Sequence, residues 1–399
     1  MAQILFIASV SFGWFIADGY RRGLFLLAIL LLDKSQRKID VMCYWKGLTN
    51  FAGLLLMTSF LWATLMPLFS GMAPLLDRIA SLPRPIEVFL YGVGAMIFAK
   101  DDFFEKHLCY LSIASAVFVS FFAFAKRLVL HFSVVRDEWV FGMHAALAGL
   151  IIASLLPWIL YAICKKRTDM RHLVFYIAAA FISLSAIFVT YYRTIWIAAA
   201  AQLILAVPLS YYCFNANLLN HKKLLAALML LTVAVLGYSY QNSYIIRDRV
   251  DRLMSIGRDF DTFATDRGEI WHEAATLISQ RKLGGYGWVD YNNFAVIKKH
   301  HPHSSYLEAA FIAGIPAGVL YGMVLAAFFS LALRYIFTGT GPRSIAYVVA
   351  LMILTTAVAG LTEAFFYASR EYLVPFWTMV SLLLSPLYVK GERHASNEK

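Results

Sequence analysis

The chain has 399 residues, of which 60% are hydrophobic, 16% aromatic and only 15% charged. So few polar residues cannot cover a soluble protein of this size, which excludes a soluble α/β enzyme, a disulfide-stabilised secreted domain and a disordered scaffold. The length accommodates about a dozen helical spans of ~20 residues, the number needed to cross a ~30 Å hydrocarbon core. The composition therefore predicts an all-α integral membrane protein.

The net charge is +11, from 35 Lys and Arg against 24 Asp and Glu. In a membrane protein such an excess commonly comes from loops that orient the spans and meet anionic headgroups. The sequence has no lysine-rich arm, RNA-binding aromatic signature or zinc-knuckle spacing, so we expect no nucleic-acid partner. Four cysteines share no CxxC spacing, and we expect them to be packing residues: Cys43, Cys109, Cys164 and Cys213.

Apolar stretches predict about twelve transmembrane helices, the first two of them short. Basic clusters after the second, sixth and eighth stretches indicate a cytoplasmic side that also holds both termini. The first stretch lacks a basic leader and a cleavage site, so we expect it to be a retained span. The stretches lie near 3–17, 23–32, 49–68, 86–99, 107–125, 139–163, 172–190, 194–213, 224–240, 304–336, 344–367 and 372–388.

One long hydrophilic segment, 241–303, interrupts the spans. Because an odd number of spans precedes it, the segment should lie outside the cytoplasmic membrane, and loops of this length usually carry function. The sequence therefore predicts three regions. These are spans one to nine over 1–240, a periplasmic loop with amphipathic helices over 241–303, and spans ten to twelve with a short cytoplasmic tail over 304–399.

The first part of this loop predicts an amphipathic helix at the membrane interface, because Ile246, Val250 and Leu253 recur at helical spacing among arginines and aspartates. Its charged face either supports the loop in solvent or contributes an arginine to a lipid phosphate. A second helix is predicted from a capping box of Asp266 and Glu269, ending near Gln280.

Arg267 lies in the first turn of that second helix, where a guanidinium beside free N–H groups can form an anion site. A surface ion pair is equally consistent with the pattern. The glycines at 284, 285 and 287 end the helix in a turn and match no nucleotide-binding loop.

Three histidines, His300, His301 and His303, lie where the chain re-enters the membrane. Pro302 and Ser304 suit a helix start, so His303 should lie in or just before the first turn. A neutral imidazole there could accept a proton. An ordinary interfacial histidine is an alternative, and a metal site is disfavoured because no carboxylate follows at ligand spacing.

Arg193 lies at the predicted external junction between spans seven and eight. A permanent charge beside apolar helices needs a partner, which makes Arg193 a functional candidate, with snorkelling to the headgroups as the alternative. Glu308 and Glu363 are candidate partners for such arginines. Gly314 and Gly318 are expected to form a close packing seam on the tenth span.

Four motifs in this order resemble the O-antigen ligase and polymerase superfamily: YRTIW at 192–196, RGEIW at 267–271, GGYG at 284–287 and HSSYL at 303–307 leading to Gly314. Within it the chain looks most like the ligases. The sequence departs from the common pattern in two places, with Ser304 where Asn is common and GIPAG where GxxG is common. The resemblance implies a GT-C-like glycosyltransferase architecture and matches His303, Arg193 and Arg267 to essential residues of the family.

The resemblance also implies the reaction, the transfer of a glycan from undecaprenyl diphosphate to lipid A–core on the periplasmic face of a bacterial inner membrane. Arg193 and Arg267 would stabilise the departing diphosphate without a metal, and His303 would act as general base for an inverting displacement. His301 and Tyr306 are further candidates for substrate binding. We expect no cofactor, the lipid-linked donor, lipid A–core and membrane lipids as partners, and a monomer.

Other functions fit parts of the sequence. An O-antigen polymerase or a protein O-oligosaccharyltransferase would use the same chemistry on another acceptor. A transporter would place ionisable residues in the middle of its spans and show internal repeats, which this chain does not. A structural scaffold would not explain why the arginines and histidines gather at one predicted face.

Overall fold

A computed structural model describes residues 1–12, 18–31, 50–69, 83–99, 102–129, 145–165, 169–214, 230, 233–234, 237–238, 240–254, 267–287, 289–297, 301–341, 343–364 and 370–385. All regular elements in these ranges are helices, which confirms the predicted all-α class. Seven helices within the described residues are long and apolar enough to cross a membrane, so the protein is a multi-pass membrane protein.

The long helices are α5 (Phe51–Phe69), α8 (Asp102–Val129), α9 (Ala145–Cys164), α10 (Met170–Phe188), α11 (Arg193–Phe214), α17 (Ile315–Thr338) and α18 (Arg343–Gly360). Shorter helices are α1 (Ala2–Ser11), α2 (Asp18–Leu30), α7 (Pro83–Phe98), α16 (Ser305–Ala313) and α19 (Arg370–Ser381), which a short 3₁₀ turn follows. Eleven of the twelve predicted stretches therefore contain a helix. The remaining stretch, near 224–240, lies largely outside the described residues.

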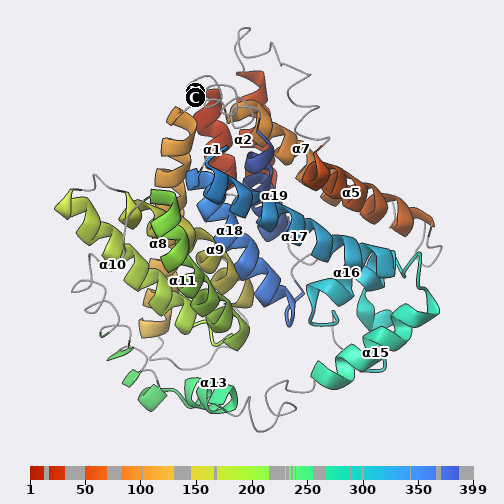
Figure 1. The fold of residues 1–399 in the computed structure, drawn as a ribbon. Helices are drawn as coiled ribbons and strands as arrows, with labels where there is room; N and C mark the ends of the chain where they lie inside the picture. Colours follow the sequence, from red (N-terminus) through yellow and green to blue (C-terminus); the bar gives the residue numbers. More distant parts are fainter. Residues whose placement is uncertain are drawn as a thin grey trace.

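Helix α9 forms the centre of the bundle. Its residues are buried along nearly the whole length, and α8, α10, α11 and α18 pack around it (Figure 1). A helix that is apolar on all sides is stable when other helices or lipid surround it, and here helices do. By contrast, few residues of α5 are buried and five of its large apolar side chains are exposed, as in a helix that faces hydrocarbon.

The predicted tenth span, 304–336, is not one helix. The chain reverses at Gly314, whose φ of 82° is left-handed, and α17 packs back against α16. A Cβ at Gly318 would lie 2.9 Å from the Tyr306 carbonyl oxygen, so the predicted small-residue seam lies within this helical hairpin. The prediction of continuity was wrong because hydropathy does not register a reversal that a glycine permits.

The described part of the predicted loop contains two α-helices, α13 (Tyr244–Met254) and α15 (Arg267–Gln280), and a short 3₁₀ helix over Tyr291–Asn293. Helix α15 ends at Gln280 as predicted, whereas Asp266 of the expected capping box lies outside the described residues. The glycine turn that follows α15 holds the end of α16, since the Tyr286 N–H donates to the Phe311 carbonyl at 2.8 Å. In Figure 1, α13 and α15 lie at the same end of the bundle, where α11 begins.

Replacing Gly314 with alanine should destabilise the protein. The new Cβ would lie 2.3 Å from the Leu283 carbonyl oxygen, and the left-handed backbone adds strain. We expect a loss of about 2 kcal/mol or more, seen as a lower melting temperature of the purified protein in detergent. Gly322→Ala is the control, because its Cβ would make only ordinary contacts with the Tyr306 ring. Equal melting temperatures for the two variants would contradict the account.

Candidate functional site

The turn that follows α18 gathers the starts of two other helices. The hydroxyl groups of Thr194, on the first turn of α11, and Thr362 form a hydrogen bond. From the start of α16, the Ser305 hydroxyl donates to the Glu363 carbonyl oxygen at 2.8 Å, and the Ser304 hydroxyl donates to the Gly360 carbonyl oxygen at 3.4 Å. The starts of α11 and α16, which lie more than a hundred residues apart in the sequence, are therefore both fixed to this turn.

The Glu363 side chain joins two of the predicted site residues. It is 5% exposed, and the Arg267 guanidinium donates to its Oε1 at 2.5 Å. Its Oε2 lies 3.8 Å from His303 Nδ1. The suggestion that Glu363 pairs with an arginine is therefore confirmed, and the carboxylate connects α15 to the start of α16.

The surroundings of Glu363 favour its ionised form. Burial in itself raises the pKa of this carboxyl, but the interactions of the carboxylate with His303, with the Arg267 guanidinium and with His301 outweigh burial. The pKa of Glu363 is consequently lowered from its ordinary value. An ionised carboxylate can hold both the guanidinium and the imidazole in place.

Arg193 adds a buried positive charge to this region. It is 7% exposed and begins α11, one residue before Thr194. The guanidinium groups of Arg249, Arg267 and Arg252 and the carboxylate of Asp248 interact electrostatically with it. Guanidinium groups gathered at a helix N-terminus, itself positive, create a strong field for an anion.

Strained backbone flanks the same residues. Within the described parts of the chain, Tyr191 (φ 64°) and His303 (φ 50°) are the two non-glycine residues with positive φ. This conformation costs on the order of 1–3 kcal/mol and persists only where surrounding contacts enforce it. Tyr191 lies two residues before Arg193, and His303 is itself a candidate site residue. Each left-handed residue therefore helps to set the direction of a candidate side chain.

The side chains of the site differ in how far they are exposed to solvent. The side chains of His303 and Arg267 are 27% and 18% exposed, whereas that of Glu363 is 6% exposed. The Trp271 indole donates to the His303 carbonyl oxygen at 3.4 Å and joins α15 to the histidine segment. His303 and Arg267 can therefore contact a ligand, whereas the more deeply buried Glu363 holds their side chains in place.

The structure also places the two remaining candidates. The His301 ring lies against the His303 ring, with centroids 4.4 Å apart, so His301 is part of the cluster. The Tyr306 hydroxyl donates instead to the Ala357 carbonyl oxygen of α18, at 3.3 Å. The described residues contain no group of three or more potential metal ligands, and His300 lies outside them.

From the sequence, Glu363 was only a possible partner of an arginine, and its place between Arg267 and His303 was not predicted. The signal available was a carboxyl group close after an apolar helix, which is costly to bury unless it serves a partner. The spacing along the chain gives no indication of which partner that is, since 96 residues separate Arg267 from Glu363.

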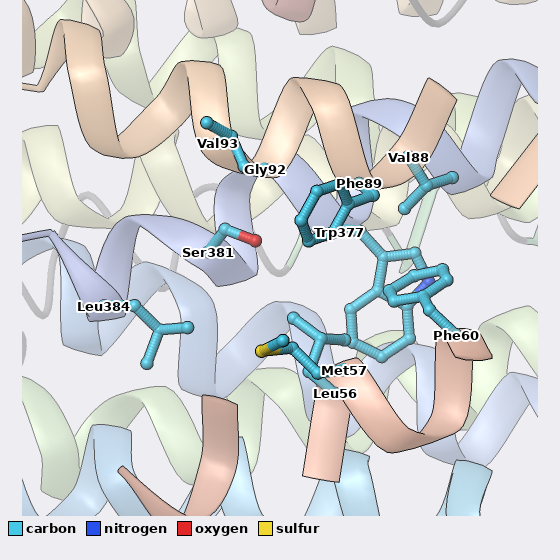
Figure 2. Close-up of a pocket in the computed structure, with 10 residues that line it drawn as sticks. All are labelled: Leu56, Met57, Phe60, Val88, Phe89, Gly92, Val93, Trp377, Ser381 and Leu384. Carbon is cyan, nitrogen blue, oxygen red and sulfur yellow. The ribbon is translucent and has the colours of Figure 1, made fainter. Parts of the chain in front are cut away.

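An apolar groove lies elsewhere, between α5, α7 and α19 (Figure 2). No titratable side chain lines it, so it cannot carry acid–base or phosphate chemistry. Its lining residues are Leu56, Met57, Phe60, Val88, Phe89, Gly92, Val93, Trp377, Ser381 and Leu384.

The fold and the site define a multi-pass membrane protein with a cationic site, containing a histidine, at one end of its bundle. Residues 178–322 match the family model described as O-antigen ligase, which confirms the resemblance over this segment. The matched segment contains Arg193, Arg267 and His303, whereas Glu363 lies beyond it. A search of curated proteins gave no match. The family indicates a glycosyl transfer of the O-antigen ligase or polymerase type.

Replacing Glu363 with glutamine should destabilise the protein by about 1–3 kcal/mol at neutral pH, because Arg267 loses a buried partner charge. Since the folded pKa of Glu363 is lowered from 4.5, the ionised carboxylate stabilises the fold above that value. This contribution is lost as the pH falls through the folded pKa. The difference in melting temperature between wild type and Glu363→Gln should therefore be largest near neutral pH.

The control for this prediction is Glu269→Gln, at an exposed position of α15. It should melt like the wild type at every pH. A difference between wild type and Glu363→Gln that persists unchanged to about pH 3 would show that the carboxylate charge is not what stabilises the site.

Proposed function

We propose that the protein is an O-antigen ligase. It transfers a glycan from undecaprenyl diphosphate to a hydroxyl group of lipid A–core oligosaccharide at the periplasmic face of a bacterial inner membrane. The observation that carries this proposal is the bridge from Arg267 through Glu363 to His303, with Arg193 close enough to interact electrostatically with Arg267. This combination would supply the two things that glycosyl transfer from a lipid diphosphate requires, positive charge to stabilise the leaving diphosphate and a base for the acceptor hydroxyl.

The first requirement is stabilisation of the leaving group. The bond between the anomeric carbon and the diphosphate oxygen breaks, and the electron pair leaves with the diphosphate. Arg193 and Arg267 would bind the phosphates and stabilise this charge. Arg267 uses one nitrogen for Glu363 and keeps other N–H groups for a ligand, because a guanidinium has five donors.

The second requirement is a base for the acceptor hydroxyl. With Nδ1 of His303 directed to Glu363, Nε2 remains to accept the acceptor proton while the acceptor oxygen attacks the anomeric carbon. Glu363 then stabilises the imidazolium that forms, as a positioning residue. At 3.8 Å the contact between His303 Nδ1 and Glu363 Oε2 is longer than a hydrogen bond and would shorten when substrate binds. Because the reaction is a single displacement, it would invert the configuration of the anomeric carbon.

The proposed topology places this site outside the cytoplasmic membrane, within 241–303 and the adjoining ends of α11, α16 and α18. Both termini would be cytoplasmic, and the regions 1–240 and 304–399 would form the membrane-embedded scaffold. His301 would assist the phosphate contact. For Tyr306, its hydrogen bond to Ala357 favours a part in holding α16 against α18.

We propose that the reaction is metal-independent, because two arginines can replace the divalent cation that sugar-nucleotide enzymes use. The loop does contain one Asp-x-Asp triplet, Asp259, Phe260 and Asp261, a spacing suited to a metal, and it lies outside the described residues. Transfer in excess chelator, and by a variant with both aspartates changed to asparagine, should match that of the untreated wild type. Loss of activity in either case would overturn this part of the proposal.

The catalytic residues are tested by Arg193→Ala, Arg267→Ala and His303→Ala. General-base help is worth ~10²–10⁴-fold, so His303→Ala should reduce transfer by at least the lower figure. Each arginine variant should abolish detectable transfer while protein remains in the membrane. The assay is transfer by purified, reconstituted protein with undecaprenyl-diphosphate glycan as donor.

Acceptors discriminate between the related activities in the same assay. Product with lipid A–core alone supports the ligase, product with a second lipid-linked glycan supports a polymerase, and product with a peptide supports a protein O-oligosaccharyltransferase. Arg247→Ala, on the exposed face of α13, is the control for the arginine variants. Near-normal transfer by Arg193→Ala, Arg267→Ala or His303→Ala would remove that residue from the mechanism.

A further inference from the structure

Two separate parts of the chain carry the residues of the candidate site. The carboxylate of Glu363 pairs with Arg267 and lies 3.8 Å from His303, so the turn after α18 positions both of these side chains. Arg193 begins a different helix, α11. Two guanidinium groups can bind one diphosphate together only if their separation is fixed to within about half an ångström.

A hydrogen bond joins these two parts. It connects the hydroxyl groups of Thr194 and Thr362, of which the first directly follows Arg193 and the second directly precedes Glu363. Helix α11 packs along α18, and the bond lies where α11 begins and α18 has just ended. The bond therefore holds the main chain at Arg193 to the main chain at Glu363.

The surroundings of this bond keep it in place. Thr194 is 7% exposed, so water cannot readily replace a lost partner of its hydroxyl group. The chain that leads into α11 is held as well, because the Thr190 hydroxyl donates to the Ile187 carbonyl oxygen at 2.7 Å and accepts from the Tyr192 N–H at 3.4 Å. A segment that is held locally moves as a unit, and the bond to the turn after α18 then sets the position of this unit.

We propose that Thr194 and Thr362 are positioning residues, whose hydrogen bond holds Arg193 at the distance from Arg267 that a lipid diphosphate spans. The inference rests on the proposed function, because the diphosphate is the donor of that reaction. The threonines act through Arg193 and not by contact with the substrate. A displacement of about 1 Å in such a group can cost ~10²-fold in rate.

Binding of undecaprenyl diphosphate to purified full-length protein in nanodiscs tests the proposal. Thr362→Val keeps the shape of the side chain but removes the hydroxyl group, and it should weaken binding about fivefold or more. Thr362→Ser retains the hydroxyl group and should bind nearly like the wild type. The matched control is Ser120→Ala, which breaks another buried hydroxyl pair, with Ser183 at 3.2 Å between α8 and α10, and should bind like the wild type.

A second background distinguishes positioning from a general structural role. In Arg193→Ala protein, which still has Arg267 to bind the phosphates, adding Thr362→Val should weaken binding no further. The same loss in both backgrounds, or wild-type affinity of Thr362→Val, would overturn the proposal. If Thr362→Val does not fold, Thr194→Val in the same two backgrounds decides in its place.

Transfer kinetics separate this proposal from the proposed function. In reconstituted protein, Thr362→Val should transfer glycan more slowly than Ser120→Ala, and Thr362→Ser should restore the rate. Wild-type protein that binds diphosphate but transfers no glycan would refute the proposed function, while the binding comparison would still decide the role of the two threonines.

Discussion

The arrangement of this protein's candidate site depends on one buried carboxylate. Glu363 lies between the guanidinium of Arg267 and the imidazole of His303, and neither of these two groups is close to it in the sequence. A charge with so little exposure is stable only when opposite charges and hydrogen bonds surround it. That requirement fixes α15 and the start of α16 relative to the end of α18, and thereby positions the residues that would carry out the chemistry.

Backbone reversals give this arrangement its rigidity. Gly314 reverses the chain so that the short helix α16 packs against α17, and the turn after α15 hydrogen-bonds to the end of α16. His303, at the other end of α16, has a left-handed φ that surrounding contacts must enforce. A short helix held at both ends keeps the imidazole at a defined position, as the proposed role of His303 as general base would require.

Much of the fold could be predicted because membrane spans are long and their hydropathy is local. The C-terminal end of α15 near Gln280 and the start of α16 could be predicted from local signals, the glycine turn at 284–287 and the N-capping Ser304. The hairpin at Gly314 was not predicted, because its apolar residues form one uninterrupted stretch. The joining role of Glu363 depends on contacts between distant segments, which no local pattern encodes.

The central claim is that Arg193, Arg267 and His303 surround a lipid diphosphate at one end of the bundle. An experimental structure of the protein in nanodiscs with an undecaprenyl-diphosphate sugar bound tests it most directly. The account predicts phosphate oxygens within about 3 Å of both guanidinium groups and the His303 imidazole facing the anomeric carbon from the opposite side. Phosphates bound away from these arginines, or at the opposite end of the bundle, would contradict it.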